Sequence, residues 1–557
     1  MVMGGDDLSE PTVQNLIFKI HSSRLAKSKW NLTLSIDEAR KNDELVNINT
    51  SQMIRWIDEL NGAEGKSEEI LSLKNAVKRI RKQKNSAENR RKVHKIHQKL
   101  FGLQFQPDLV SVVMDRTQHF KRAAKGFKIN GIQYVRLVAT SNGVKLGVTL
   151  YISERLSEEI RRRIDNGRNK EVELVPAKLE AYRALTCSGS TPVTTPRIAV
   201  VPDCETKFFA DVINISDGDG EDPIVEYEDH AEVELCESDG YGLMSPEMAA
   251  QWADDLGLDY VPGGFCTRWS WEKGMLFPID FIRFSDEVAG TRIIKDVWGD
   301  DVDLSNIDVI LSTSMLKLYQ AYNSCQEYVE CCTENHYQFS VTKYAPASED
   351  LDIVRHSNYQ FIQSMQFSDD DLDELLVPTI SYIEDILSYN PEKATLYLHG
   401  TGVANQNPRH MMNDYTKALL IDERLQKDVF VQKSIASLLK KRITGAKIGI
   451  LSLHANFTII GGDPYSFMQN MHGLEVTGLL KPHELYSSFW RDRNVKEVLG
   501  FRAPMSAAEN IVKMKVSYSE EAADWFTHIK CVTLLSSFSA ECHALNGADK
   551  HNCPLRR

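Results

Sequence analysis

The sequence of 557 residues lacks the patterns that direct a chain into a membrane or out of the cell. No apolar run approaches the ~20 residues of a membrane span. The first residues show no basic stretch followed by an apolar one, which is the pattern of a secretory signal. The ten cysteines have no CxxC spacing, so we interpret them as free thiols rather than as a disulfide framework or a zinc site. We therefore expect a cytoplasmic protein with no membrane among its partners.

The sequence also has no low-complexity tract and no internal repeat with a period of about 20–50 residues. Its 42% apolar and 26% charged residues are typical of a globular protein. Its length exceeds the roughly 100–200 residues of one domain, so several domains are expected. The net charge of −13 argues against indiscriminate binding of polyanions by the whole surface, although it averages over strong local differences.

The strongest local charge lies in residues 66–101, which we predict to form one or two helices. Leu73, Val77 and Ile80 keep helical spacing, so one face of this segment packs against the protein. Between positions 74 and 99 the segment has a single acidic residue, Glu88, and the cations Lys74, Lys78, Arg79, Arg81, Lys82, Lys84, Arg90, Arg91, Lys92, Lys95 and Lys99. This pattern has two interpretations, a solvated basic face or a surface that contacts nucleic-acid phosphates. If it is the second, we expect the contacts to come from Lys78, Arg79, Arg81, Lys82, Arg90, Arg91 and Lys92.

The pattern of apolar and polar residues along the chain changes several times. Residues 130–152 alternate around Asn142-Gly143, which predicts a β-hairpin with a type I′ turn. Residues 186–196 are rich in Ser, Thr and Pro and are typical of a linker. Strand-like runs dominate from 197 to about 320, helical patterns from about 325 to 445, and strands and turns from 448. We expect an α+β protein with domains at 1–185, 197–325, 326–447 and 448–557.

The acidic stretch SDGDGEDP at 216–223 has the composition of a metal-binding loop. It lacks the register of a calcium-binding EF-hand loop and the bidentate glutamate that ends one. It also lies between two strand-like runs. We interpret it as an exposed turn, and we find no partner motif that would make it the centre of a metal-dependent hydrolase.

Residues 237–281 carry a more specific arrangement. The turn Asp239-Gly240-Tyr241-Gly242 leads into a helix that Ser245 can cap and in which Pro246 suits the first position. Lys273 then opens a further strand, and Lys317 follows a later strand. A lysine at a strand end can reach a phosphate as a point charge, and the simpler interpretation is a surface lysine beside a turn.

In this order the stretches DGYGLMSPEMA, Arg268 with Lys273-Gly274 and Leu276, and DVILSTSMLKLY resemble the first double-psi β-barrel of the two-barrel RNA polymerases. That superfamily includes the cellular RNA-dependent RNA polymerases of RNA silencing and the single-chain YonO-like polymerases of phages. The resemblance implies that Lys273 and Lys317 contact nucleotide phosphates and the nucleic-acid backbone, and that Arg268 contributes to substrate binding. It also implies a helical connector at 326–447 and a second, catalytic barrel from 448.

The second half of the chain carries two further stretches of this resemblance. FRAPMS, which begins at Phe501 and contains Arg502, is similar to the family's arginine-proline motif, whose arginine contacts the sugar of the incoming nucleotide. NGADK places Asp549 at the first of the three aspartates that hold catalytic magnesium in the family. His551 and Cys553 stand where the other two belong, and neither imidazole nor thiolate suits magnesium.

The resemblance implies template-directed RNA synthesis from nucleoside triphosphates with Mg²⁺, with a DNA template favoured because the YonO-like group is the best match. An RNA template and a non-catalytic nucleic-acid-binding protein are the alternatives. We expect the second barrel to be truncated and this chain to be catalytically inactive, because one aspartate of three leaves magnesium underligated. If a phage or prophage carries the gene, the protein is expected in the cytoplasm of the host.

Overall fold

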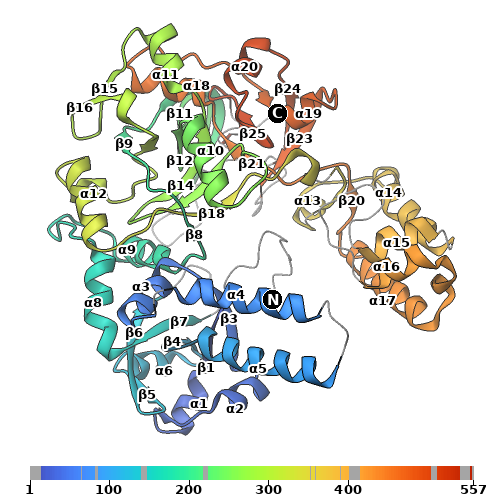
Figure 1. The fold of residues 1–557 in the computed structure, drawn as a ribbon. Helices are drawn as coiled ribbons and strands as arrows, with labels where there is room; N and C mark the ends of the chain where they lie inside the picture. The colour runs from blue at the N-terminus through green and yellow to red at the C-terminus, as the bar shows by residue number, and fades with distance from the viewer. Residues whose placement is uncertain are drawn as a thin grey trace.

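A computed structural model of the chain describes residues 14–63, 65–81, 86–139, 147–216, 224–351, 353–357, 359–388, 391–399, 414–502, 511–539 and 552–554. Figure 1 shows an N-terminal sheet with its helices in blue and teal, two β units in green to red, and a helical module in yellow and orange at one side. The mixed α and β composition agrees with the expected α+β class. In the ranges described, no helix is both long and apolar enough to cross a membrane.

The N-terminal part is built on a seven-stranded mixed sheet of order β2-β5-β6-β7-β4-β1-β3. Its strands are β1 (Gln14–His21), β2 (Asn31–Leu32), β3 (Leu45–Asn49), β4 (Phe105–Val113), β5 (Phe127–Ile129), β6 (Ile132–Val138) and β7 (Val148–Ser153). β6 and β7 pair antiparallel, so the hairpin predicted at 130–152 is confirmed, while its turn at 140–146 lies outside the described residues. Helices α3 (Gln52–Leu60) and α8 (Glu154–Asp165) connect this part to the next.

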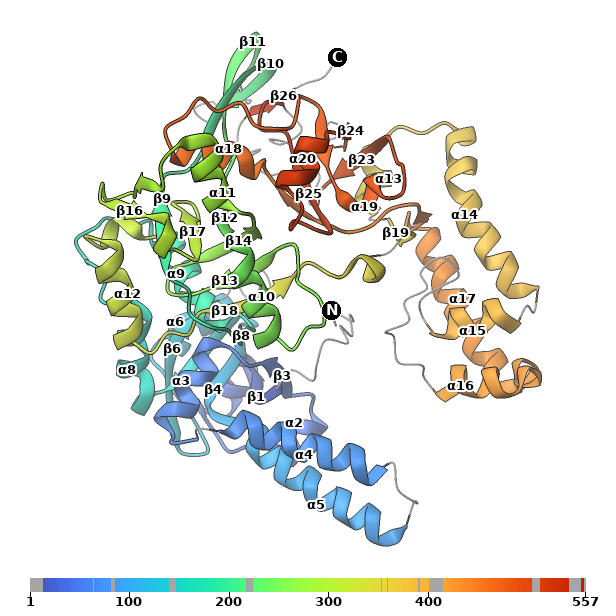
Figure 2. The same cartoon turned by 45° about the horizontal axis from the view of Figure 1, so that its top comes forward.

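Two helices project from the sheet as a basic arm, α4 (Lys66–Arg81) and α5 (Ala87–Gln104), which Figure 2 shows side by side. Ile70, Val77 and Leu100 are buried between them, so the apolar stripe faces the partner helix and the cations face outward. The backbone NH of Asn89 donates to the hydroxyl of Ser86, 3.1 Å away, which caps α5. The helical prediction for this segment is confirmed.

A second seven-stranded sheet has the order β8-β18-β13-β14-β12-β17-β9. Its strands are β8 (Thr191–Pro192), β9 (Ile198–Val201), β12 (Tyr241–Met244), β13 (Phe265–Arg268), β14 (Lys273–Pro278), β17 (Val309–Ser312) and β18 (Ser340–Tyr344). The helical region predicted from 325 to 445 begins with α12 (Cys325–Glu334). It is then interrupted by the strand β18, which pairs with β13 and β8. Buried Phe339 and Val341 hold this segment against the sheet.

A five-stranded sheet of order β21-β25-β22-β24-β23 follows later in the chain. Its strands are β21 (Ile459–Gly461), β22 (Glu484–Tyr486), β23 (Glu497–Phe501), β24 (Ile511–Val516) and β25 (Val532–Leu535). The helices α18 (Pro464–Met471), α19 (Ser488–Arg491) and α20 (Glu520–Trp525) lie in its connections.

The last two sheets contain the same arrangement of five strands. In the first unit, β9 is parallel to β17, β17 antiparallel to β12, β12 parallel to β14, and β14 antiparallel to β13. In the second unit, β21, β25, β22, β24 and β23 repeat this order and these directions. The chain therefore carries a duplicated topology, which was invisible as a sequence repeat because strand order can persist without residue identity.

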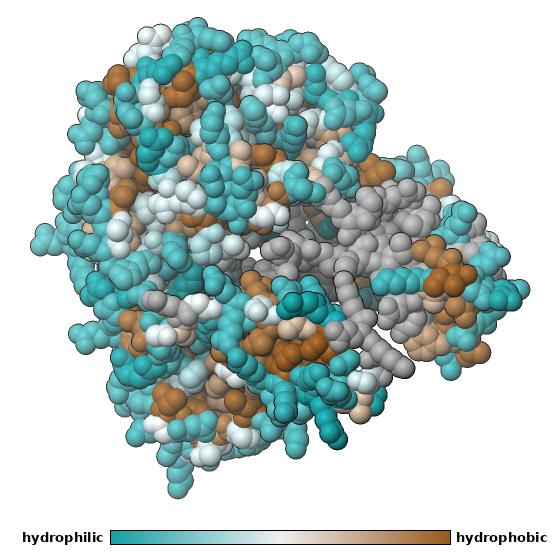
Figure 3. Space-filling model, viewed as in Figure 1, coloured by the Kyte–Doolittle hydropathy of each residue, from teal (hydrophilic) through white to brown (hydrophobic). Residues whose placement is uncertain are grey.

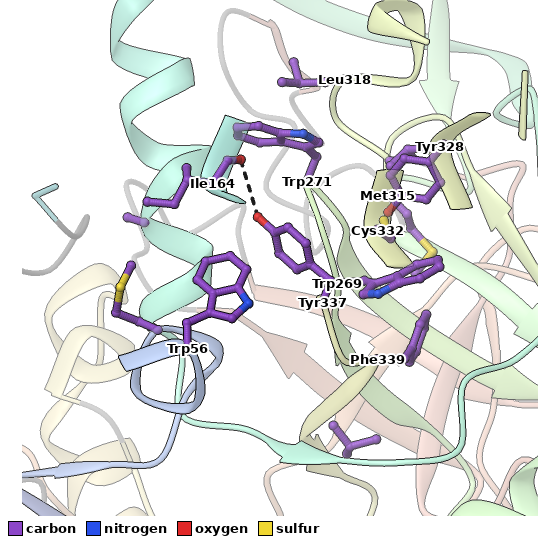
Figure 4. Close-up of a cluster of buried hydrophobic side chains, with 14 of the residues drawn as sticks. Trp56, Ile164, Trp269, Trp271, Met315, Leu318, Tyr328, Cys332, Tyr337 and Phe339 are labelled. Atoms are coloured by element: carbon purple, nitrogen blue, oxygen red, sulfur yellow. Dashed lines mark hydrogen bonds between the residues drawn. The ribbon is translucent and has the colours of Figure 1, made fainter. Parts of the chain in front are cut away.

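Two hydrophobic cores join these parts. Phe277 and Ile310 of the first unit pack in one core with Phe467 and Leu534 of the second. A larger core, drawn in Figure 4, joins the N-terminal part to the first unit, with Trp56 of α3 facing Tyr337. The Trp56 and Tyr337 rings lie edge to face with centroids 4.7 Å apart, and the Trp56 indole NH donates to the carbonyl of His336 at 3.1 Å. The segment 186–196 is part of this region, since β8 pairs with β18.

The helical module contains α13 (Tyr359–Ser364), α14 (Asp369–Leu387), α15 (Pro391–His399), α16 (Asp414–Ile421) and α17 (Val429–Ala446). Ser368 and Asp371 form a capping box at the start of α14, and the acidic residues there suit the positive end of the helix dipole. Figure 3 shows hydrophobic side chains on the surface of this module. The most exposed large hydrophobic residues of its helices and their connections are Ile421, Val429, Leu420 and Val377.

A long antiparallel ribbon leaves the first unit between β9 and β12. It consists of β10 (Glu205–Ser216) and β11 (Ile224–Cys236), and β26 (Asn552–Pro554) pairs with the other edge of β10. Figure 2 shows the ribbon projecting from the top of the molecule. The acidic stretch 216–223 connects the two long strands, and all of it but Ser216 lies outside the described residues.

Candidate phosphate-binding site

The elements around Lys273 form as the sequence predicts. The hydroxyl of Ser245 accepts from the backbone NH of Met248 at 3.1 Å, and Pro246 opens α10 (Pro246–Asp255). Lys273 is the first residue of β14, and Arg268 is the last residue of β13. The antiparallel register sets Arg268 and Lys273 opposite each other, so two cations share one end of the hairpin.

Lys317 is held beside this hairpin by backbone hydrogen bonds. Its NH donates to the carbonyl of Trp271 at 3.1 Å, and the NH of Lys273 donates to the carbonyl of Met315 at 3.1 Å. Glu272 and Leu316 form the β-bridge between them. The segment that follows β17 therefore runs along the end of the β13–β14 hairpin, and three cations from three segments meet there.

The three cations raise the local positive potential. Partial burial lowers the pKa of Lys273, and the neighbouring charges of Arg268 and Lys317 lower it further. In the described part of the chain, none of these three side chains forms an ion pair with a carboxylate. We define Arg268, Lys273 and Lys317 as the cationic cluster, and its net positive charge favours an anionic ligand.

One carboxyl group lies beneath the cationic cluster. Glu272 is fully buried, and the Thr267 hydroxyl donates to its Oε1 at 2.8 Å, while Oε2 has no hydrogen-bond partner in the described residues. Burial raises the pKa of Glu272 to about 7, against the opposing effects of Thr267, Arg268 and Lys317. Near neutral pH this group therefore supplies only part of a negative charge, and the cluster stays positive.

Glycines allow the strands around the cluster to approach closely. A Cβ on Gly274 would lie 2.4 Å from Cε of Met315 and 2.7 Å from the carbonyl oxygen of Gly240. A Cβ on Gly242 would lie 2.2 Å from the carbonyl oxygen of Ile310. Any side chain at these positions would push apart the turn, β14 and β17, so both glycines are required by close packing.

Asp203 holds the two loops next to the cluster. Its Oδ1 accepts from the hydroxyls of Ser238 at 2.9 Å and Ser314 at 2.8 Å, and its Oδ2 accepts from Thr313 at 2.7 Å. The Ser314 hydroxyl in turn accepts from the NH of Gly240 at 2.8 Å. These hydrogen bonds connect the glycine turn to the segment that leads to Lys317. They therefore fix the position at which that segment begins.

A second buried polar network lies where the two β units meet. Glu237 and Asp463 are both fully buried, the Tyr241 hydroxyl donates to Glu237, and Asp463 accepts from the NH groups of Tyr465, Leu479 and Leu480. Burial raises the pKa of Glu237 to about 8 and raises that of Asp463 as well. A Cβ on Gly462 would lie 2.2 Å from Oε1 of Glu237, so the units are in close contact at this point.

The remaining residues expected in the site lie elsewhere or outside the described ranges. Arg502 is exposed and directly follows β23, next to residues 503–510, which the structure does not describe. Asp549 and His551 also lie outside the described residues. Within the described part, no group of three or more His, Cys, Asp or Glu side chains is arranged to hold a metal ion. The set Asp549, His551 and Cys553 has one carboxylate and two donors that magnesium disfavours, so it does not fit Mg²⁺.

The basic arm presents the cations predicted for it. Exposed side chains there include Lys78, Arg79, Arg81, Arg90, Arg91 and Lys92. Lys92 pairs with Glu88 at 2.6 Å, and Lys82 lies outside the described residues. The arm and the cationic cluster are separate surfaces, one on helices of the N-terminal part and one on strand ends of the first unit.

Sequence reasoning missed Asp203, Glu237, Glu272 and Asp463. Glu272 directly precedes Lys273, so its position was visible, but nothing local marks a glutamate as buried. Asp463 could have been suggested by Pro464 behind it, because an aspartate followed by proline is typical of a capped helix start.

Together, the fold and the site define an α+β protein with two β units of equal topology and a cluster of three cations on the first. No protein-family model matches the chain. The chain is 25% identical over 437 residues to the DNA-directed RNA polymerase YonO of Bacillus phage SPbeta, an alignment that covers 74% of this chain and 48% of that protein. This match confirms the resemblance to YonO-like polymerases. The chain spans about half the length of the curated relative it matches.

A comparison with solved structures finds the RNA dependent RNA polymerase QDE-1 from Thielavia terrestris. The two chains superpose with a TM-score of 0.48 at 14% sequence identity, over 77% of this chain and 46% of that one.

Proposed function

We propose that this chain is the nucleic-acid- and nucleotide-binding part of a template-directed RNA polymerase, with DNA as the template. The cationic cluster carries the proposal, because three unpaired cations at strand ends suit the phosphates of a nucleotide or a backbone. The similarity to a phage polymerase that is named DNA-directed supports a DNA template.

The two β units are, in this proposal, two double-psi β-barrels. Their equal strand order and directions support a common origin of the units, as the resemblance implies. The shared core of Phe277, Ile310, Phe467 and Leu534 supports a fixed orientation of one unit against the other. In this proposal, the cationic cluster on the first unit and the loop of Asp549 on the second act on the same substrate.

Each candidate residue has a proposed role. Lys273 and Lys317 bind phosphates of the nucleotide or of the nucleic-acid backbone as point charges. Arg268 assists them with a guanidinium that can bind two oxygens of one phosphate. Arg502 contacts the sugar of the incoming nucleotide, and Asp549 is the remaining aspartate of the magnesium loop.

We further propose that this chain binds substrate without turning it over. Magnesium in a polymerase aligns the RNA 3′ hydroxyl and the triphosphate, and it requires several closely placed carboxylate oxygens. His551 and Cys553 cannot supply these oxygens, so one carboxylate remains of the three the family uses. No catalytic step can be written for such a site.

Primer extension together with binding tests this proposal. A labelled RNA primer annealed to a DNA template is incubated with the chain, Mg²⁺ and nucleoside triphosphates, and binding is followed by fluorescence anisotropy. We expect salt-dependent binding of the primed template and no extension. Extension that is lost in Lys273→Ala would contradict the proposed inactivity, and absence of any binding would contradict the polymerase-derived function itself.

The same assay separates the alternatives. If an RNA template with the same primer binds more tightly than the DNA template, the function is that of an RNA-templated enzyme. A purely nucleic-acid-binding role is favoured by the exposed cations of the basic arm, which need no nucleotide. That role predicts binding of unprimed DNA as tight as that of primed DNA, and no effect of Lys273→Ala.

A further inference from the structure

Two residues of the cationic cluster lie on one face of a three-stranded part of the second sheet. β18, β13 and β14 are neighbours there, in that order (Figure 2). Side chains alternate between the two faces of a strand. Phe265 of β13 and Leu276 of β14 are fully buried in the large core. Arg268 and Lys273 therefore belong to the opposite face, on which Lys273 is exposed.

β18 brings a further lysine to this face. The register sets Lys343 directly opposite Cys266, and residues that pair in this way point to the same face. Cys266 lies two residues before Arg268, and the guanidinium of Arg268 donates to the sulfur of Cys266 at 3.7 Å. Lys343 is exposed, and in the part of the chain that the structure describes it forms no ion pair with a carboxylate.

Lys343 lies beside the cationic cluster rather than within it. With strands about 4.8 Å apart and about 3.4 Å between residues, its Cα is roughly 8 Å from that of Arg268 and roughly 12 Å from that of Lys273. Charges along one strand of a duplex recur at about 3.4 Å of helix axis. Cations that are this far apart suit the successive phosphates of a nucleic-acid strand.

The positions between these cations carry no carboxylate. Cys266 and Met275 pair across β13 and β14, and they separate Lys343 from Lys273 on this face. Both side chains are partly exposed. A phosphate backbone that crosses from β14 to β18 would therefore meet cations at its ends and uncharged side chains between them, without repulsion from these positions.

We infer that Lys343 extends the cationic cluster into a surface for the nucleic-acid backbone, in which Lys343 contacts a phosphate of the polymer and not of the nucleotide. This inference rests on the proposed function, in which the cluster binds phosphates of the substrate. A lysine that neutralises a backbone phosphate releases a counterion, so its contribution depends on salt. Such a contact needs a positive charge at this position, which arginine can also supply.

Titrations of the full chain with a labelled RNA primer annealed to a DNA template test this inference by fluorescence anisotropy. Lys343→Ala should weaken binding by about three- to tenfold and reduce the slope of log affinity against log salt by about one. Lys343→Arg should bind as the wild type does. Lys295→Ala, which removes an exposed lysine paired with Asp301, is the matched control and should change neither quantity. Because Lys343 is exposed, Lys343→Ala should unfold at the wild-type temperature.

A second measurement separates binding of the polymer from binding of the nucleotide. Inorganic tripolyphosphate should raise the thermal unfolding temperature of Lys343→Ala as much as that of the wild type, whereas Lys273→Ala should lose most of this response. Loss of the response in both variants would overturn the inference, because Lys343 would then bind the nucleotide.

The anisotropy results also separate this inference from the proposed function. Unchanged affinity and slope in Lys343→Ala would overturn the inference, and so would Lys343→Arg binding as weakly as Lys343→Ala. If Lys273→Ala still weakens binding in that case, the proposed function stands without the contact from Lys343. Absence of any binding by the wild type would overturn both.

Discussion

Arg268, the last residue of β13, lies opposite Lys273, the first residue of β14, so that two positive side chains meet at one end of an antiparallel hairpin. Like charges in such a position destabilise a sheet, and Lys317 adds a third charge beside them. An arrangement of this kind costs stability until an anion binds. The cationic cluster is therefore expected to gain stability from phosphate-bearing ligands.

Inorganic tripolyphosphate should raise the thermal unfolding temperature of the chain, and Lys273→Ala should remove most of this effect. At a concentration of about ten times the dissociation constant, the ligand adds ~1.4 kcal/mol, which corresponds to a rise of about 1 °C for cooperative unfolding of a chain of this length. Differential scanning fluorimetry measures it. As a matched control, Lys295→Ala changes an exposed lysine of the same region that pairs with Asp301, and it should keep the full response. If tripolyphosphate raises the unfolding temperature of Lys273→Ala and Lys295→Ala equally, the anion binds somewhere other than the cationic cluster.

The basic arm should contribute to nucleic-acid affinity in a salt-dependent way. Neutralising Lys78, Arg79, Arg91 and Lys92 to Gln should reduce the slope of log affinity against log salt by up to about one for each phosphate that these cations neutralise. Anisotropy titrations of a labelled duplex at several salt concentrations measure this slope. The control variant neutralises Lys121, Lys125 and Lys128, which are exposed on the same N-terminal part. If both variants change the slope equally, the arm has no special role.

Stability should fall as pH rises from about 4.5 to 8, because burial raises the pKa of Glu237 to about 8 and that of Glu272 to about 7. A carboxylic acid whose folded pKa exceeds its unfolded value contributes stability that is complete below the unfolded pKa and is lost as pH rises through the folded one. Glu237→Gln keeps an acceptor for Tyr241 and cannot ionise. This substitution should reduce the fall in the free energy of unfolding with rising pH by up to about 1.4 kcal/mol per pH unit.

Urea unfolding followed by tryptophan fluorescence at several pH values measures this decline. Glu234→Gln is a suitable comparison, since Glu234 lies three residues before Glu237, on β11, but is exposed. A pH dependence that Glu237→Gln leaves as steep as in the wild type would show that Glu237 is already ionised in the folded protein.

Close contact between the two β units should make Gly462 intolerant of a side chain. In Gly462→Ala the new Cβ meets Oε1 of Glu237 at 2.2 Å and its carbonyl oxygen at 2.7 Å, so we expect a loss of about 1–3 kcal/mol in the free energy of unfolding. Gly102→Ala, within α5 and with no atom within 4 Å of the new Cβ, should instead gain about 0.5–1 kcal/mol. Equal effects would mean that the units do not meet as described.

Local signals in the sequence predicted the elements that carry the cluster. Ser245 and Pro246 mark the start of α10, and the glycine after Lys273 marks a strand that must approach its neighbours. Helical spacing of Leu73, Val77 and Ile80 predicted the basic arm. These features follow from capping, backbone freedom and periodicity, which depend on residues a few positions apart.

Features that depend on distant residues were not predictable in the same way. β18 joins the sheet because Val341 pairs with Thr267, more than seventy residues earlier, and a short strand next to helices gives little local signal. Glu237 and Glu272 are glutamates that sequence reasoning assigns to the surface, and only the folded chain shows their burial. The duplicated strand order is likewise a property of the assembled sheets.

Site-specific crosslinking tests the central claim most directly, namely that the cationic cluster binds phosphates near the RNA 3′ end of a primed DNA template. A 4-thiouridine at the RNA 3′ end of a primed DNA template is photo-crosslinked to the chain, and the attached peptides are identified by mass spectrometry. The account predicts crosslinks to peptides that contain residues 265–278 or 313–319, and their loss in Lys273→Ala combined with Lys317→Ala. Crosslinks confined to the basic arm at 66–104, unchanged in that variant, would contradict it.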